Sequence, residues 1–170
     1  VLGRLLPEVE ARLRVRWLSR VADLRAEHPL RTPGIDDPRS HYGLIRAVAD
    51  CLDDEASIVT DVGQHQMWVA QAYPLRRPRQ WMTSGGLGTM GFGLPAAIGA
   101  ALAEPQRTVV CFTGDGSILM NVQELETACR LGTSFVAVVW RDDSYGMTRW
   151  NQEIRFGREI GMRFTNPDFA

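Results

Sequence analysis

Two hydrophobic patterns divide the 170-residue chain near its start. In residues 5–27, Arg and Glu alternate with Leu, Val and Trp17 at helical spacing, which predicts one amphipathic helix with a polar outer face. Residues 29–40 hold three prolines and a glycine and follow no period, which predicts a linker. We therefore expect the tail of an upstream domain in residues 1–28 and the main domain, truncated at its C-terminus, in residues 41–170.

Beyond the linker, short apolar runs alternate with helical stretches. The predicted strands are 57–63, 80–83, 107–113 and 134–140. The predicted helices are 42–52, 65–73, the last part of 84–103 and 121–132, with a turn at 114–117. Pro95 suits the first turn of the third helix, and Gly132 suits the C-cap of the fourth. Nearly continuous apolar strands alternating with helices predict an α/β fold, a doubly wound parallel sheet with helices on both faces.

Composition narrows the class of protein. Hydrophobic residues make up 45% and charged residues 23%, values typical of globular domains and not of disordered or fibrous chains. All 19 basic residues are Arg, which excludes a Schiff-base lysine and a Walker-type phosphate lysine. No apolar run could cross a bilayer, so no membrane is expected as partner. No nucleic acid is expected as partner either. With no initiator Met and an abrupt end, the sequence reads as a piece of a longer protein.

The three cysteines are odd in number and far apart. Cys51, Cys111 and Cys129 stand in apolar surroundings, which predicts buried, reduced thiols rather than a disulfide or zinc framework. This cysteine usage indicates a cytoplasmic protein.

Two acidic motifs carry the strongest chemical signal. GDGS at 114–117 and DDSYG at 142–146 each follow a predicted strand, and one predicted helix connects them. A strand, helix, strand unit brings the carboxyl ends of its strands together, so Asp115 and Asp142 should meet. Two neighbouring carboxylates need a hard cation between them, and a carbonyl near Ser144, water and phosphate could complete its shell. An aspartate before a helix is more often only an N-cap, but the pair favours a metal-bridged diphosphate site.

Two further segments accompany this pair. Six glycines between Gly85 and Gly99 favour a backbone edge bonded to a planar heterocycle, with Met90 as an apolar prop. The alternative is close helix packing, which we expect for Gly93 and Gly99. Gln64 and His65 follow another strand and could donate to a phosphate, although a lone loop histidine is more often a surface or cap residue. Trp68, Trp81 and Trp140 are predicted to be core residues.

The motifs together resemble a known family. GDGS with Asp142 placed 27 residues after Asp115 is similar to the thiamine-diphosphate motif, which usually ends in NN. GQHQMW and WMTSGGLGTMGFGLPAAIGAAL resemble the C-terminal diphosphate-binding domain of the acetolactate synthase (acetohydroxyacid synthase) family. The resemblance runs from Tyr42 to the C-terminus. It implies an enzyme that decarboxylates pyruvate and ligates the hydroxyethyl carbanion to a second 2-oxo acid.

The resemblance also implies roles for particular residues. The metal ligands for Mg²⁺ would be Asp115, Asp142 and the carbonyl of Ser144. The cofactor-binding residues would be Gln64, His65, Gly88, Met90, Gly114, Gly116 and Ser117. Met90 would hold the cofactor bent, while Met147 and Trp150 would line the substrate pocket. A catalytic glutamate would come from another domain of a partner subunit, so a homodimer or homotetramer with the active site between subunits is implied. FAD in the full-length protein is left open.

The sequence departs from the family pattern at two places. Arg141-Asp142 replaces NN, which adds a negative charge to the metal site. Trp150 follows Gly146 by four residues, whereas biosynthetic members have five, and MTRWNQEIRFGR is similar to the catabolic synthases. Acceptor preference and metabolic role therefore stay open. The alternatives are a related thiamine-diphosphate-dependent 2-oxo acid decarboxylase or carboligase, and a non-catalytic nucleotide- or phosphate-binding α/β domain.

Overall fold

The chain consists of two compact units, Val1–Arg31 and Thr32–Ala170. The computed structural model describes residue 7 and residues 12–169. Each unit is treated by itself below, and the second contains every predicted site residue.

The first unit contains helix α2, Val15–Glu27. None of its residues is buried, and Trp17 and Leu18 are 63% and 53% exposed. The prediction of a helix over residues 5–27 is confirmed from Val15 onward and wrong for residues 12–14, which precede the helix. Of its earlier part, residues 5, 6 and 8–11 lie outside the described residues.

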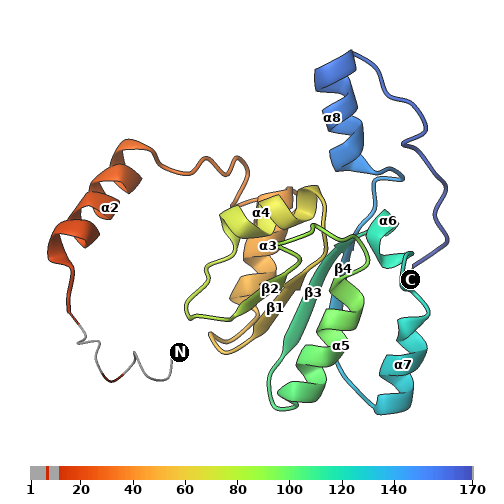
Figure 1. Cartoon of the computed structure of the whole chain (residues 1–170), viewed down its shortest axis with the longest axis horizontal. Helices are drawn as coiled ribbons and strands as arrows, with labels where there is room; N and C mark the ends of the chain where they lie inside the picture. The colour runs from red at the N-terminus through yellow and green to blue at the C-terminus, as the bar shows by residue number, and fades with distance from the viewer. Residues whose placement is uncertain (1–6, 8–11, 170) are drawn as a thin grey trace. The chain divides into compact units, whose positions relative to one another are not determined.

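The second unit is built on a parallel sheet of four strands in the order β2-β1-β3-β4 (Figure 1). The strands are β1 Ser57–Thr60, β2 Trp81–Thr83, β3 Val109–Gly114 and β4 Val136–Trp140. Every neighbouring pair is parallel, and Val59 is in register with both Met82 and Cys111. β1 and β3 lie at the centre and are almost completely buried, as expected for a sheet covered on both faces.

Helices cover both faces of this sheet (Figure 1). The helices of this unit are α3 His41–Asp50, α4 Gln64–Ala72, α5 Gly93–Ala103, α6 Asp115–Ile118, α7 Glu124–Leu131 and α8 Gly146–Phe156. Of these, α8 lies away from the sheet (Figure 1) and has no buried residue. Because successive side chains of a strand point to opposite faces, Ile58 belongs to the core cluster with α3 and α4, whereas Val59 belongs to the cluster with α5. The predicted doubly wound α/β fold is confirmed.

The boundaries of the elements follow the sequence with local differences. Pro95 lies in the first turn of α5, and Gly132 caps α7 in the left-handed conformation at φ 64°, as predicted. The GDGS turn instead forms the short helix α6, and α7 starts at Glu124 rather than at residue 121. Helix α8 was not predicted, and none of its residues is buried in this unit.

The predicted burial of the three cysteines is confirmed for Cys111 alone. Cys111 is buried in β3, and burial raises the pKa of its thiol to about 12. Cys51 and Cys129 are exposed instead: Cys51 is the C-cap of α3, and Cys129 lies in the last turn of α7. All three thiols are free. Within residues 12–169, no helix has the length and apolar character needed to span a membrane.

Two glycines of α5 test the packing interpretation with opposite results. A Cβ on Gly93 would lie 2.9 Å from both Cβ and Oδ2 of Asp61, so the predicted close packing is confirmed there. A Cβ on Gly99 would meet nothing within 4 Å, so the prediction is wrong for Gly99, which faces open space.

This contrast predicts mutations of opposite sign on one helix. We expect Gly93→Ala to lower the free energy of unfolding by about 1–3 kcal/mol, because the buried Asp61 cannot move away without losing its own bonds. Gly99→Ala should raise it by up to about 1 kcal/mol, since alanine is the better helix former. Urea denaturation of both variants measures the two changes, and a loss of stability in Gly99→Ala would contradict the open space at that position.

Candidate functional site

A cavity of about 410 Å³ opens at the carboxyl ends of β1, β3 and β4. This edge of a parallel sheet is where α/β folds bind ligands, and the volume lies within the usual range for small-molecule sites. Ten of the twelve predicted site residues line it: Gln64, His65, Met90, Gly114, Asp115, Gly116, Ser117, Asp142, Ser144 and Met147. The other two do not: Gly88 is an exposed loop residue, and Trp150 on α8 is 46% exposed.

Asp115 is the best-anchored polar residue of the cavity. It directly follows β3 and is only 2% exposed. Its Oδ1 accepts the N–H of Gly116 at 2.8 Å, and its Oδ2 accepts the N–H groups of Asp142 at 3.1 Å and Asp143 at 2.8 Å. The Asn166 amide donates to the same Oδ2 at 2.7 Å. The two chain segments predicted to meet therefore do meet, through the backbone that follows β4.

The Asp142 carboxylate turns toward its own loop. Its Oδ1 accepts the N–H of Ser144 at 3.2 Å and its Oδ2 accepts the Ser144 hydroxyl at 3.0 Å. A Cβ on Gly146 would lie 2.7 Å from Asp142 Oδ2 and 2.6 Å from Gln64 Oε1, so only glycine lets these two oxygens approach the start of α8. Carboxylate and amide oxygens thus gather at the mouth of the cavity.

The C-terminal segment packs against the loop after β4. The N–H of Tyr145 donates to the Met162 carbonyl at 2.9 Å, and the N–H of Phe164 donates to the Asp143 carbonyl at 3.1 Å. This pairing brings Asn166 to Asp143, whose Oδ1 accepts its amide at 2.6 Å. The Asn166 bond and the neighbouring Arg141 lower the pKa of the Asp143 carboxyl. Sequence reasoning missed Asn166, and no local motif marks it.

His65 lies at the start of α4 and is 4% exposed. Burial lowers the pKa of its imidazole to about 4, against an ordinary value of 6.5, although the nearby Asp61 and Asp115 carboxylates oppose the shift. Its Nε2 is buried and makes no hydrogen bond within the described part of the chain. The His65 side chain borders the cavity. Native interiors rarely leave such an atom unpaired, so this nitrogen is suited to a ligand.

This shift predicts how stability depends on pH. In the unfolded chain His65 takes up a proton near pH 6.5, whereas in the folded chain it does so only near pH 4. Protonation therefore favours unfolding between these values, and stability falls as the pH is lowered through this window. We expect a loss of about 3 kcal/mol between pH 7 and pH 4 from this residue alone. Urea denaturation at several pH values should show a correspondingly smaller loss in His65→Gln; equal losses in both proteins would contradict the neutral, buried imidazole.

Asp61 holds the glycine-rich loop through hydrogen bonds to its backbone. It follows β1, has no exposed surface, and its Oδ1 accepts the N–H groups of Val62 at 2.7 Å and Gly91 at 3.0 Å. Its Oδ2 accepts the N–H of Gly93 at 2.6 Å, and the Asn121 amide donates to the Gly91 carbonyl at 2.7 Å. Sequence reasoning assigned no role to Asp61, although its place at the end of a buried strand is the signal that identified Asp115.

Aromatic side chains form the apolar wall of the cavity. Trp68 and Trp140 meet at a ring distance of 5.9 Å, and both also pack against the core, as does Trp81, so their predicted core role is confirmed. His41 stacks on Trp68 at 4.0 Å with rings 5° from parallel. The cavity therefore combines an acidic, polar mouth with a flat aromatic side, which suits an amphipathic ligand that carries a ring.

The residues present fit a divalent cation and a diphosphate. Asp115, Asp142 and the Ser144 backbone offer only oxygen donors, which Mg²⁺ prefers. Within residues 12–169 no three His, Cys, Asp or Glu side chains converge on one point, so a bound cation would need backbone, water or ligand oxygens to complete its shell. The unpaired His65 Nε2 borders the same cavity, and in the neutral ring, which donates to the Asp61 backbone, it suits a donor such as an ordered water or a ligand N–H.

Comparisons with known proteins agree with this geometry. Residues 61–170 match the family model described as thiamine pyrophosphate enzyme, C-terminal TPP binding domain. The chain is 58% identical over 160 residues to the acetolactate synthase isozyme 1 large subunit of Escherichia coli K12, covering 94% of this chain and 28% of that protein. It is 46% identical over 129 residues to acetolactate synthase 1, chloroplastic, of Nicotiana tabacum, covering 74% of this chain and 19% of that protein. The predicted resemblance is confirmed, and the chain spans less than a third of the length of these relatives.

Proposed function

The chain belongs to the thiamine pyrophosphate enzymes, whose C-terminal TPP binding domain it contains, and we propose that it is the cofactor-binding part of an acetolactate synthase large subunit. The observation that carries this proposal is the single cavity around Asp115, which is lined by ten of the residues that the family resemblance implies. The 58% identity to an acetolactate synthase large subunit supports the same activity. The proposed reaction decarboxylates pyruvate and joins its two-carbon unit to a second 2-oxo acid.

The proposal includes an organisation of the chain. Residues 41–170 would be the cofactor domain, residues 29–40 the linker, and residues 1–28 the tail of an upstream domain. The compact unit that begins at Thr32 supports a boundary in this region. We also propose a homodimer or homotetramer, in which a partner subunit supplies the catalytic glutamate. FAD binding, which the family resemblance leaves open for the full-length protein, would involve a domain other than this cofactor domain.

The polar mouth of the cavity would hold Mg²⁺ and the diphosphate. Asp115, Asp142 and the Ser144 carbonyl would bind the cation. The Ser117 hydroxyl donates to the Val62 carbonyl at 3.1 Å, which leaves its oxygen free to accept from water in the cation's shell. The low pKa of His65 keeps its imidazole neutral near neutral pH, and the ring donates its one N–H to the Asp61 backbone. Its Nε2 is then an acceptor, so His65 would contact the diphosphate through an intervening water.

Thiamine diphosphate, when bound, supplies the electron sink that decarboxylation of a 2-oxo acid and carbon–carbon bond formation require. The chain's own contribution is to orient the ring and keep water away. Met90 borders the cavity from the glycine-rich loop, whose backbone Asp61 fixes. Trp68 and Trp140 give a low-dielectric wall, in which the charges of the site act more strongly than in water. Met147 at the start of α8 also lines the cavity, and the 2-oxo acid would bind beside it.

The decisive experiment measures cofactor binding and product with the full-length protein. Calorimetry should give a heat of binding with thiamine diphosphate and Mg²⁺ and none with ATP. The loaded enzyme should form acetolactate from pyruvate. Asp115→Ala should lose both signals, whereas Asp50→Ala, which removes only an exposed carboxylate paired with Arg46, should keep both.

Each alternative gives its own outcome in this experiment. Heat with ATP alone would favour a nucleotide-binding α/β domain and overturn the proposal. Cofactor binding with acetaldehyde or another carboligation product in place of acetolactate would assign a related decarboxylase or carboligase. Comparing pyruvate with 2-oxobutyrate as acceptor would then define the preference that Arg141, Asp142 and the spacing of Trp150 leave open.

A further inference from the structure

We propose that a second cavity, at the amino ends of the strands, binds a small aliphatic monocarboxylate through the guanidinium of Arg79. The cavity measures about 310 Å³. It is bordered by Ser57 and Met82, at the start of β1 and in the middle of β2, and by residues of the last turns of α5. It therefore lies at the sheet edge opposite the cofactor cavity, and the inference does not depend on the proposed function.

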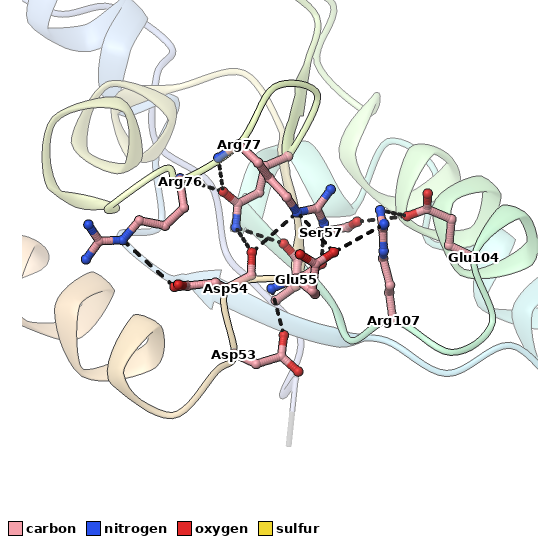
Figure 2. Close-up of polar contacts among 10 residues, drawn as sticks. Asp53, Asp54, Glu55, Ser57, Arg76, Arg77, Glu104 and Arg107 are labelled. Atoms are coloured by element: carbon pink, nitrogen blue, oxygen red, sulfur yellow. Dashed lines mark hydrogen bonds and ion pairs between the residues drawn. The ribbon is translucent and has the colours of Figure 1, made fainter.

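Two of the three arginines that line this cavity already have partners (Figure 2). The Glu55 carboxylate lies 3.5 Å from Nε of Arg77 and 3.3 Å from Nη2 of Arg107. Arg107 is also paired with Glu104, whose carboxylate lies 3.5 Å from the Ser57 hydroxyl. These charges compensate one another and contribute no free positive charge.

Arg79 is different. It is exposed and lines the cavity, and among residues 12–169 its side chain has no hydrogen bond or ion pair. Its φ of 62° places a residue other than glycine in the left-handed region, which is sparsely populated. Such strain is found mostly at functional sites, where the surrounding structure imposes it.

The neighbouring Gln80 explains how this conformation is imposed. Gln80 is 1% exposed, and its side-chain oxygen accepts the N–H of Arg76 at 2.8 Å. Its side-chain nitrogen donates to the carbonyls of Asp54 at 3.1 Å and Ala56 at 3.2 Å. The loop backbone is thus held from inside the protein, and it presents Arg79 at the rim of the cavity.

The charges and the lining define the ligand class. One unpaired guanidinium matches one carboxylate, which it can bind with two parallel hydrogen bonds. A dianion such as phosphate would leave a negative charge facing Glu104 and the negative end of α5. Met82, Ala100 and Ala103 give the rest of the cavity an aliphatic lining, which suits a short carbon chain. A 2-oxo acid and an aliphatic amino acid share this carboxylate chemistry.

The test uses butyrate as probe with the intact enzyme, followed by ligand-observed NMR. We expect saturable binding that weakens by at least about tenfold in Arg79→Gly, because the charge-assisted bonds are lost. Glycine accepts the left-handed conformation, so this variant should unfold at the same temperature as the parent or higher. The matched control is Arg76→Ala, since Arg76 pairs with Asp54 outside the cavity, and this variant should bind butyrate normally.

Competition with four-carbon relatives identifies the source of the carboxylate. Stronger displacement of butyrate by 2-oxobutyrate would assign the cavity to 2-oxo acids, and stronger displacement by 2-aminobutyrate would assign it to amino acids. The proposal is overturned if butyrate does not bind, if Arg79→Gly binds it as tightly as the parent, or if inorganic phosphate displaces it at lower concentration than either organic competitor.

Discussion

Asp115→Ala is expected to lower the free energy of unfolding by about 3 kcal/mol and to abolish binding of thiamine diphosphate with Mg²⁺. The substitution leaves the N–H groups of Gly116, Asp142 and Asp143 without an acceptor, and the Asn166 amide keeps only its bond to Asp143. Relief of repulsion among the neighbouring carboxylates and entry of water would recover part of this loss. Urea denaturation measures the stability, and calorimetry measures the cofactor.

The matched control for this prediction is Ser117→Ala. Ser117 is as buried as Asp115, at 2% exposed, and lines the same cavity, but it makes one hydrogen bond, to the Val62 carbonyl. Its removal should cost about 1 kcal/mol. If Asp115→Ala costs no more than Ser117→Ala, or if it still binds Mg²⁺ thiamine diphosphate with parental affinity, the central role of this carboxylate is refuted.

The sequence predicted the fold well because its signals were local and repeated. Strands such as 109–114 are mostly apolar and lie between helical stretches, so period and length alone indicate a buried parallel sheet. Gly132 and Pro95 marked helix ends by their backbone preferences. Helix α8 was missed although Met147, Trp150 and Ile154 stand at helical spacing, and none of its residues is buried in this unit.

The site was predictable where its residues follow strands, and not where the tertiary fold brings them in. Asp115 and Asp142 could be paired because neighbouring parallel strands end at one edge. Asn166 reaches Asp115 from 51 residues away, through pairing of the C-terminal segment with the loop after β4, and no pattern in the sequence encodes that return. Gly99 shows the opposite error, since its glycine looked like a packing requirement but faces open space.

Asp61→Ala is the second substitution with a large expected effect, a loss of about 3 kcal/mol in the free energy of unfolding. Asp61 has no exposed surface and accepts the N–H groups of Val62, Gly91 and Gly93. Alanine would leave all three donors unpaired, those of Gly91 and Gly93 in buried positions, and the loop that carries Met90 to the cavity would lose its anchor. Amide hydrogen exchange at Gly91 and Gly93 should become faster than in the parent, because these groups then open without breaking a charge-assisted bond.

Asp50→Ala is again the matched control, because Asp50 is the same residue type in an exposed ion pair with Arg46 at 3.0 Å and should change stability by less than about 0.5 kcal/mol. The two readouts separate anchoring from simple burial. If Asp61 only fills space, Asp61→Asn should be as stable as the parent, and amide exchange at Gly91 and Gly93 should stay as slow as in the parent. If Asp61 anchors the loop as an acceptor, the NH₂ group that Asp61→Asn introduces would face a backbone N–H donor, and the bond to that donor would be lost. The variant should then be less stable and exchange faster at Gly91 and Gly93, although the side-chain volume is unchanged.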